Sequence, residues 1–160
     1  MAIREIRQFG DRILNKKARE VTEMTPKIKE LIQDMFETMH DEIGVGLAAP
    51  QVGVLKRIVV INSDGRDLTF INPVIIETEG EQVGNEGCLS LPGKTGTVAR
   101  PNLVKVKALN ANMEEFVLEG TELLARAICH ECDHLDGILY TEHVIGELQD
   151  VMNDEEEIEI

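Results

Sequence analysis

The chain has 160 residues, 42% hydrophobic and 29% charged, with a net charge of −14 and few aromatic side chains. One domain of this length can bury a core of aliphatic residues and Met without disulfide bonds. No apolar run is long enough for a membrane span, and the acidic balance argues against nucleic-acid binding. The odd number of cysteines, three, and the absence of an apolar leader predict a cytoplasmic protein.

The first predicted element is a helix over residues 25–43. Thr25 is a suitable N-cap, Pro26 suits the first helical position, and Gly44 is expected to end the helix. Apolar residues recur between them at helical spacing. The segment 44–53 that follows is rich in glycine and predicts a turn.

Strands are predicted for the middle of the chain from its Val and Ile content. Asp64-Gly65 is expected to make a hairpin turn, and Pro73 predicts an edge or a bulge in its strand. Residues 86–90 read as a loop because Gly and Pro surround them. The strand-like runs are 57–62, 68–76, 103–109 and a short run at 115–118 that is able to pair with the one before it.

Helical spacing returns over residues 121–136, with Leu123 and Ala127 among the positions expected on the buried side and Gly137 as the stop. A last short helix is predicted at about 141–152. The order of helix, strands and helix predicts an α+β domain with mixed or antiparallel sheets around a central helix. Residues 149–160 hold six acidic residues and no basic one, so we expect an acidic tail after a single domain at 1–148.

The clearest chemical signal is an HExxH motif at residues 130–134, inside the predicted helix. Residues four apart lie one turn above each other, so His130 and His134 can bind one metal ion from the same side. Glu131 is then placed to act as a general base on a water molecule at that metal.

A catalytic metal site of this kind commonly has a third protein ligand and an open position for water. Downstream candidates are Glu142, His143 and Glu147, the arrangement expected of an HExxH peptidase. The upstream candidate is Cys88, whose thiolate would be a strong, soft ligand, although a Cys can also be a small buried apolar residue. Cys129 and Cys132 form a CxxC pair, but their place in a helix disfavours a redox or zinc motif.

Three segments together make the chain similar to the peptide deformylase family. They are GVGLAAPQ at 44–51, EGCLS at 86–90 and HECDHLDG at 130–137, in the family's order and spacing. The resemblance covers about residues 3–148 and implies hydrolysis of the formyl group from formyl-methionyl N-termini of new polypeptides, with release of formate. It also implies nascent chains at the ribosome as partners.

The resemblance implies specific roles at the reaction centre. Cys88, His130 and His134 would bind the metal, which in the family is usually Fe(II), with Zn, Ni or Co able to substitute. Glu131 would move protons, and the Leu89 backbone N–H and the Gln51 side-chain amide would donate to the oxyanion.

The substrate positions follow from the same resemblance and from the helix face. Gly44, Val45 and Gly46 would lie along the substrate main chain, which pairs as an added strand. Leu123, Ala127 and Arg126 would line the slot for the methionine side chain. Arg126 stands where relatives commonly have an apolar residue. We expect its stem to cover part of the slot and its guanidinium to stay in solvent, the alternative being a carboxylate partner.

Two other classes of function compete with this interpretation. An HExxH peptidase would use a downstream ligand and would keep its metal without Cys88. A metal-stabilised peptide-binding module would need neither a general base nor an oxyanion donor, so Glu131 and Gln51 argue against it.

Overall fold

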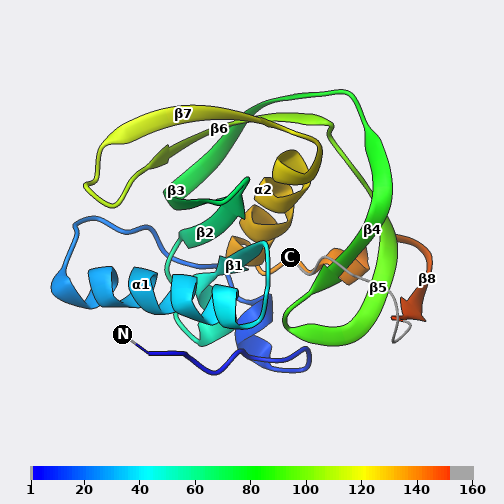
Figure 1. The fold of residues 1–160 in the computed structure, drawn as a ribbon, viewed down its shortest axis with the longest axis horizontal. Coiled ribbons are helices and arrows are strands. Elements are labelled where there is room, and N and C mark those ends of the chain that lie inside the picture. The colour runs from blue at the N-terminus through cyan, green and yellow to red at the C-terminus, as the bar shows by residue number, and fades with distance from the viewer. Residues whose placement is uncertain (1, 152–160) are drawn as a thin grey trace.

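The computed structural model describes residues 2–151, and within them two α-helices pack with two antiparallel sheets (Figure 1). The larger sheet has the strand order β1-β2-β3-β6-β7, and the smaller sheet has the order β4-β5-β8. All pairs of named strands are antiparallel, so the α+β class is confirmed with antiparallel sheets. No helix in residues 2–151 has both the length and the apolar character needed to span a membrane.

The elements of the larger sheet agree with most of the predicted strands. Asp64 and Gly65 both have positive φ and form a two-residue hairpin, and Pro73 lies at a register shift between Ile71 and Val74. Both expectations are confirmed. The strands of this sheet are β1 Gly46–Ala48, β2 Ile58–Ser63, β3 Arg66–Glu79, β6 Leu103–Leu109 and β7 Glu115–Thr121.

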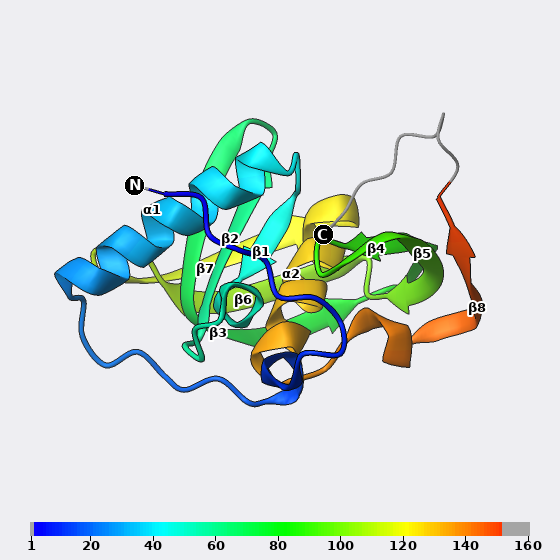
Figure 2. The same ribbon diagram turned by 90° about the horizontal axis from the view of Figure 1, so that it is seen from below.

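Strand β2 is buried on both sides because a helix covers each face of the larger sheet (Figure 2). Val59 and Ile61 pack into the core cluster of α2 (Glu122–Leu135), while Ile58 and Val60 pack into the cluster of α1 (Pro26–Asp41). This alternation follows from the two-residue period of a strand. The helix α2 therefore lies between the two sheets, in the middle of the molecule.

The first helix begins as predicted and ends slightly earlier. Thr25 accepts a hydrogen bond from the backbone N–H of Ile28, and Pro26 is the first helical residue. The helix ends at Asp41, and Ile43 adopts the left-handed conformation with φ 54°. The N–H of Gly44 then donates to the carbonyl of Met39, which closes the last turn.

The smaller sheet was not predicted. Residues 86–90 were expected to be a loop, but Cys88 is the last residue of β4 (Gln82–Cys88), which pairs with β5 (Leu91–Arg100). This hairpin was not predicted from residue propensities because it contains several glycines, which are depleted in strands. Gly96 in particular is required by packing, because a Cβ there would lie 2.6 Å from the side chain of Val144.

The predicted C-terminal helix at about 141–152 is wrong. Residues Tyr140–Glu142 form one 3₁₀ turn, and β8 (Val144–Asp150) pairs with β5. Gly146 has φ 81°, which a continuous helix does not allow, and pairing with a sheet edge overrides the helical spacing of the apolar residues. Asp150 belongs to this strand, and the rest of the expected acidic tail, from residue 152, lies outside the described residues.

Candidate metal centre and active site

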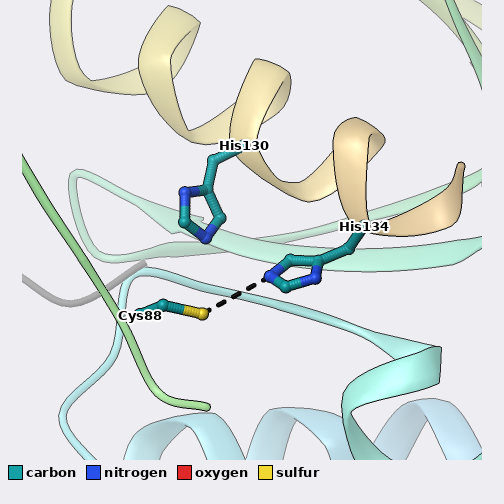
Figure 3. Close-up of side chains that lie close together, drawn as sticks. All are labelled: Cys88, His130 and His134. Carbon is teal, nitrogen blue, oxygen red and sulfur yellow. Dashed lines mark hydrogen bonds between the residues drawn. The ribbon is translucent and has the colours of Figure 1, made fainter. Parts of the chain in front are cut away.

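Three buried side chains meet where α2 faces the end of β4. His130 and His134 project from successive turns of α2, and Cys88 approaches from β4 (Figure 3). Their ligand atoms all lie within 4.8 Å of one another, and the Cys88 Sγ is 3.4 Å from His134 Nε2. Sequence positions 42 residues apart therefore converge on one point.

The donor atoms of this cluster fit a divalent metal ion. No residue of the described chain makes a hydrogen bond with His130 Nε2, although the atom is buried, so it is an orphaned lone pair beside a thiol. Burial and the neighbouring His130 hold the pKa of His134 well below its usual value, which keeps that imidazole neutral. Neutral imidazoles and a thiolate are ligands that Zn, Fe, Co and Ni accept.

Glu86 fixes the orientation of His130 and was missed as a functional residue. Its Oε1 lies 2.8 Å from His130 Nδ1, and Arg100 donates to both carboxylate oxygens at 2.8 and 3.0 Å. Burial would raise the pKa of Glu86, but the hydrogen bonds from His130 and Arg100 hold that pKa far below its usual range. An ionised carboxylate can only accept, so Nδ1 carries the proton and Nε2 is left to bind a metal.

Arg126 does not reach solvent, and that expectation was wrong. The residue is 4% exposed, its Nη1 donates to Glu86 Oε2 at 2.6 Å, and the same nitrogen donates to the carbonyl of Val98 at 3.1 Å. The rejected alternative, a carboxylate partner, is the one observed. The physical reason is that the buried carboxylate of Glu86 supplies a negative charge, which offsets the cost of removing the Arg126 guanidinium from water.

Glu131 lies against strand β1 and is fully buried. A Cβ added at Gly46 would lie 2.8 Å from Glu131 Oε2, so this glycine is what gives the carboxylate its space. Neither carboxylate oxygen has a hydrogen-bonding partner among the described residues. Burial raises the pKa of Glu131 well above its usual value, and the nearby charge of Glu86 adds to the shift. A carboxyl group in this state is suited to taking up and returning a proton.

The side chain of Gln51, in the 3₁₀ turn Ala49–Val52, extends toward Cys88. Its side-chain carbonyl accepts from the N–H of Ala48 at 2.9 Å, which points the Nε2 group toward Ser90 Oγ at 3.0 Å and Cys88 Sγ at 3.5 Å. Leu89 follows Cys88, and a Cβ on Gly44 would lie 2.8 Å from its side chain. Both expected oxyanion donors therefore lie next to Cys88: the Gln51 amide contacts its Sγ, and Leu89 is the next residue in the chain.

Some of the residues expected to bind substrate line a hollow at the surface, and others do not. Val45 and Leu123 line one hollow of about 300 Å³ together with Ile61 and Leu124. Leu123 is 40% exposed, which corrects the expectation that it marks the buried side of its helix. Ala127 is fully buried in the core and does not line that hollow.

Two of the three alternative metal ligands are engaged elsewhere. Glu142 accepts from the backbone N–H of Leu139 at 2.8 Å, and His143 lies 3.3 Å from Asp133. Burial raises the pKa of the Cys129 thiol to about 11, so it is a poor source of thiolate. These contacts favour Cys88 as the third donor of the cluster.

Comparison with known proteins identifies a family that this chain matches over almost its whole length. Residues 3–149 match the model of a family described as polypeptide deformylase. A peptide deformylase of Agathobacter rectalis is 62% identical over 94% of this chain and 96% of its own length. Another, from Lachnoclostridium phytofermentans, is 60% identical over 99% of both chains.

Solved structures give the same result for the fold. The crystal structure of peptide deformylase from Thermotoga maritima superposes with a TM-score of 0.88, at 39% identity, over 90% of this chain and 99% of that one. A peptide deformylase from Synechococcus elongatus, in complex with actinonin, superposes with a TM-score of 0.86 at 39% identity, over 88% of this chain and 78% of that one.

Proposed function

The chain belongs to the polypeptide deformylase family, and from this premise we propose how its residues remove the formyl group from the N-termini of new polypeptides. The family is one of metallohydrolases, so the first question is where the metal is held. We assign it to Cys88, His130 and His134, which makes α2 the metal-binding HExxH helix. The observation that carries this assignment is the convergence of three buried donor atoms within 4.8 Å, one of them an orphaned imidazole nitrogen.

A divalent metal bound there would lower the pKa of a water molecule and polarise the formyl oxygen. Fe(II) is our proposed native metal because it is the usual metal of the family, and Zn, Ni or Co could substitute because a donor set of one thiolate and two imidazoles suits all four. The chain's own contribution is to present these donors without rearrangement. Glu86 locks the ring of His130, and the fold of β4 and β5 fixes Cys88.

Glu131 is the proton carrier in this proposal. It takes a proton from the attacking water and later gives it to the amine that leaves when formate forms. Its buried position with no donor from the described protein leaves both oxygens available for that water. Its raised pKa makes the carboxylate a stronger base for taking the proton from that water.

The oxyanion that forms on the formyl oxygen when the formyl carbon becomes tetrahedral would be stabilised by two fixed donors, the Gln51 side-chain amide and the backbone N–H of Leu89. Gln51 is buried, and its carbonyl end is anchored on the N–H of Ala48, so its amide is held before charge develops. Donors fixed in this way contribute strongly to rate.

We infer that the peptide binds along the free edge of β1, which is the terminal strand of the larger sheet. Gly44, Val45 and Gly46 would pair with its main chain as an added strand. The first side chain would enter beside Val45 and Leu123, with the stem of Arg126 and Ala127 behind them. Val45, Leu123 and Leu124 give the hollow an apolar part for a methionine side chain, although Asp64, Glu119 and Glu122 also line it.

The family of the chain supports further proposals about its substrates, its cellular compartment and its domain organisation. We propose nascent chains at the ribosome as its substrates, which places it in the cytoplasm. We also propose that residues 1–148 belong to a single catalytic domain, which β8 extends to Asp150, and that the acidic residues after β8 have no catalytic part.

The direct test is formate release from a formyl-Met-Ala-Ser peptide under anaerobic conditions. The wild-type protein should turn it over, while Glu131→Ala should keep its metal and lose about 10²–10⁴-fold in kcat. Glu142→Ala is the matched control, because that carboxylate caps a turn on the surface, and it should retain activity. A wild-type protein that holds metal but releases no formate would refute the proposed function.

A further inference from the structure

Arg126 forms part of a buried charge network that ends on the proposed metal ligand His130. The carboxylate of Glu86 lies at its centre and is fully buried. Arg126 donates to Oε2 at 2.6 Å, Arg100 donates to both oxygens, and His130 Nδ1 contacts Oε1 at 2.8 Å. Two guanidinium groups and one imidazole therefore share a single carboxylate.

The place of Arg126 in this network is built into the fold. On β4, a Cβ at Gly84 would lie 3.3 Å from Arg126 Nη2, so a side chain there would crowd the guanidinium. On β5, the carbonyl of Val98 accepts a hydrogen bond from Nη1. On α2, Arg126 is four residues before His130 and so lies one turn away on the same side.

The two arginines differ in how their charge is balanced. Arg100 also donates to Asp133 at 2.8 Å, so its positive charge is shared between two carboxylates. The ion pairs of Arg126 within the described chain involve Glu86 alone. Removing Arg126 would therefore leave Glu86 still paired with Arg100 while taking one positive charge away from the centre.

This inference rests on the proposed function: we propose that Arg126 is a positioning residue that acts on His130 through Glu86 and keeps the metal electron-poor. Because Arg126 draws on the lone pairs of Glu86, the carboxylate accepts less strongly from His130 Nδ1–H, and His130 Nε2 is a weaker donor to the metal. The positive charge of Arg126 also opposes a dication. Both effects weaken metal binding and strengthen the pull of the metal on the formyl oxygen.

The experiment is a titration of metal-free protein with Zn(II) against a chelating indicator, together with the absorption spectrum of the Co(II) form. Arg126→Met should bind Zn(II) about tenfold more tightly than the wild type, shift the Co(II) bands and lower kcat. Arg126→Lys keeps the charge and should restore the wild-type affinity and spectrum. Arg4→Met, which removes a guanidinium from the buried Asp34 on α1, is the control and should leave the affinity unchanged.

The sign of the change separates this role from a purely structural one. If Arg126 only supported the packing, Arg126→Met would bind Zn(II) equally or more weakly, and either result would overturn the inference. Should the Met variant fail to fold, Arg126→Gln provides the same removal of charge with a polar side chain, and tighter binding is again required. A wild-type protein with no Zn(II) affinity would instead refute the metal site itself.

Discussion

Gly46 provides the sharpest test of how Glu131 is held. A Cβ at this position would lie 2.8 Å from Oε2, 3.0 Å from Cγ and 3.2 Å from Cδ of Glu131, so the whole end of the side chain is crowded. The backbone of Gly46 is paired with Ile61 on β2 and resists displacement. Contacts of 3.4 Å or more are ordinary for a Cβ, so in Gly46→Ala the carboxylate must retreat by about 0.6 Å.

A displacement of this size should lower kcat substantially, because a 1 Å misplacement of a reacting group can cost about 10²-fold. We expect Gly46→Ala to lose about 10–100-fold in kcat. The metal content should not change, since Glu131 is not a proposed ligand. The N–H and C=O of residue 46 remain, so pairing with the substrate main chain persists and KM should change little. The assay is formate release with metal analysis of the same samples.

A double-mutant cycle identifies the cause. If Gly46→Ala acts only by displacing Glu131, it should have no further effect on kcat when it is added to Glu131→Ala. An equal loss in both backgrounds, or a change confined to KM, would show that the glycine serves the substrate rather than the carboxylate and would refute the reasoning.

Two further predictions concern stability. Asp34→Asn should cost about 1–3 kcal/mol of unfolding free energy, because Asp34 is buried and accepts charge-assisted hydrogen bonds from Ala2 and Arg4. Burial opposes ionisation of Asp34, but these hydrogen bonds hold its pKa below the ordinary 3.8. The stability advantage of the wild type over Asp34→Asn should therefore be complete above pH 3.8 and vanish as the pH falls through the lowered pKa. Urea unfolding over a pH series measures this difference in stability, and a difference that does not change with pH would contradict the prediction. Gly137→Ala should cost at least about 2 kcal/mol, since φ is +74° and a Cβ would meet a backbone carbonyl at 2.5 Å. Gly65→Ala, with φ +79° and open space, is the control in thermal unfolding and should cost clearly less; equal losses would mean that the carbonyl contact is unimportant.

The sequence predicted both α-helices and the larger sheet apart from β1, which lies in the segment expected to be a turn, because their patterns are local. The cap at Thr25 and the hairpin at Asp64-Gly65 are decided by a few neighbouring residues. The smaller sheet is different, since β5 pairs with β4 and with the distant β8. Gly84 and Gly96 in this sheet leave room for the side chains of Arg126 and Val144, and no local pattern distinguishes such glycines from those of a loop.

The candidate site shows the same division. The spacing of His130 and His134 is a local property of one helix turn, so their convergence follows from the motif. The partner of Arg126 depends on how β4 lies against α2, which the sequence alone did not provide. A useful signal was present, because a buried acid such as Glu86 needs a cation, and Arg126 one turn before a motif histidine was available to supply it.

The central claim is that Cys88, His130 and His134 hold one divalent metal ion, and metal stoichiometry in Cys88→Ser tests it most directly. The wild-type protein, purified and analysed anaerobically, should contain one metal per chain and release formate from formyl-Met peptides. A serine hydroxyl ionises poorly and is a hard ligand, so the variant should lose most of its metal or its activity while its thermal unfolding stays cooperative. One metal per chain with full activity in Cys88→Ser would contradict the account.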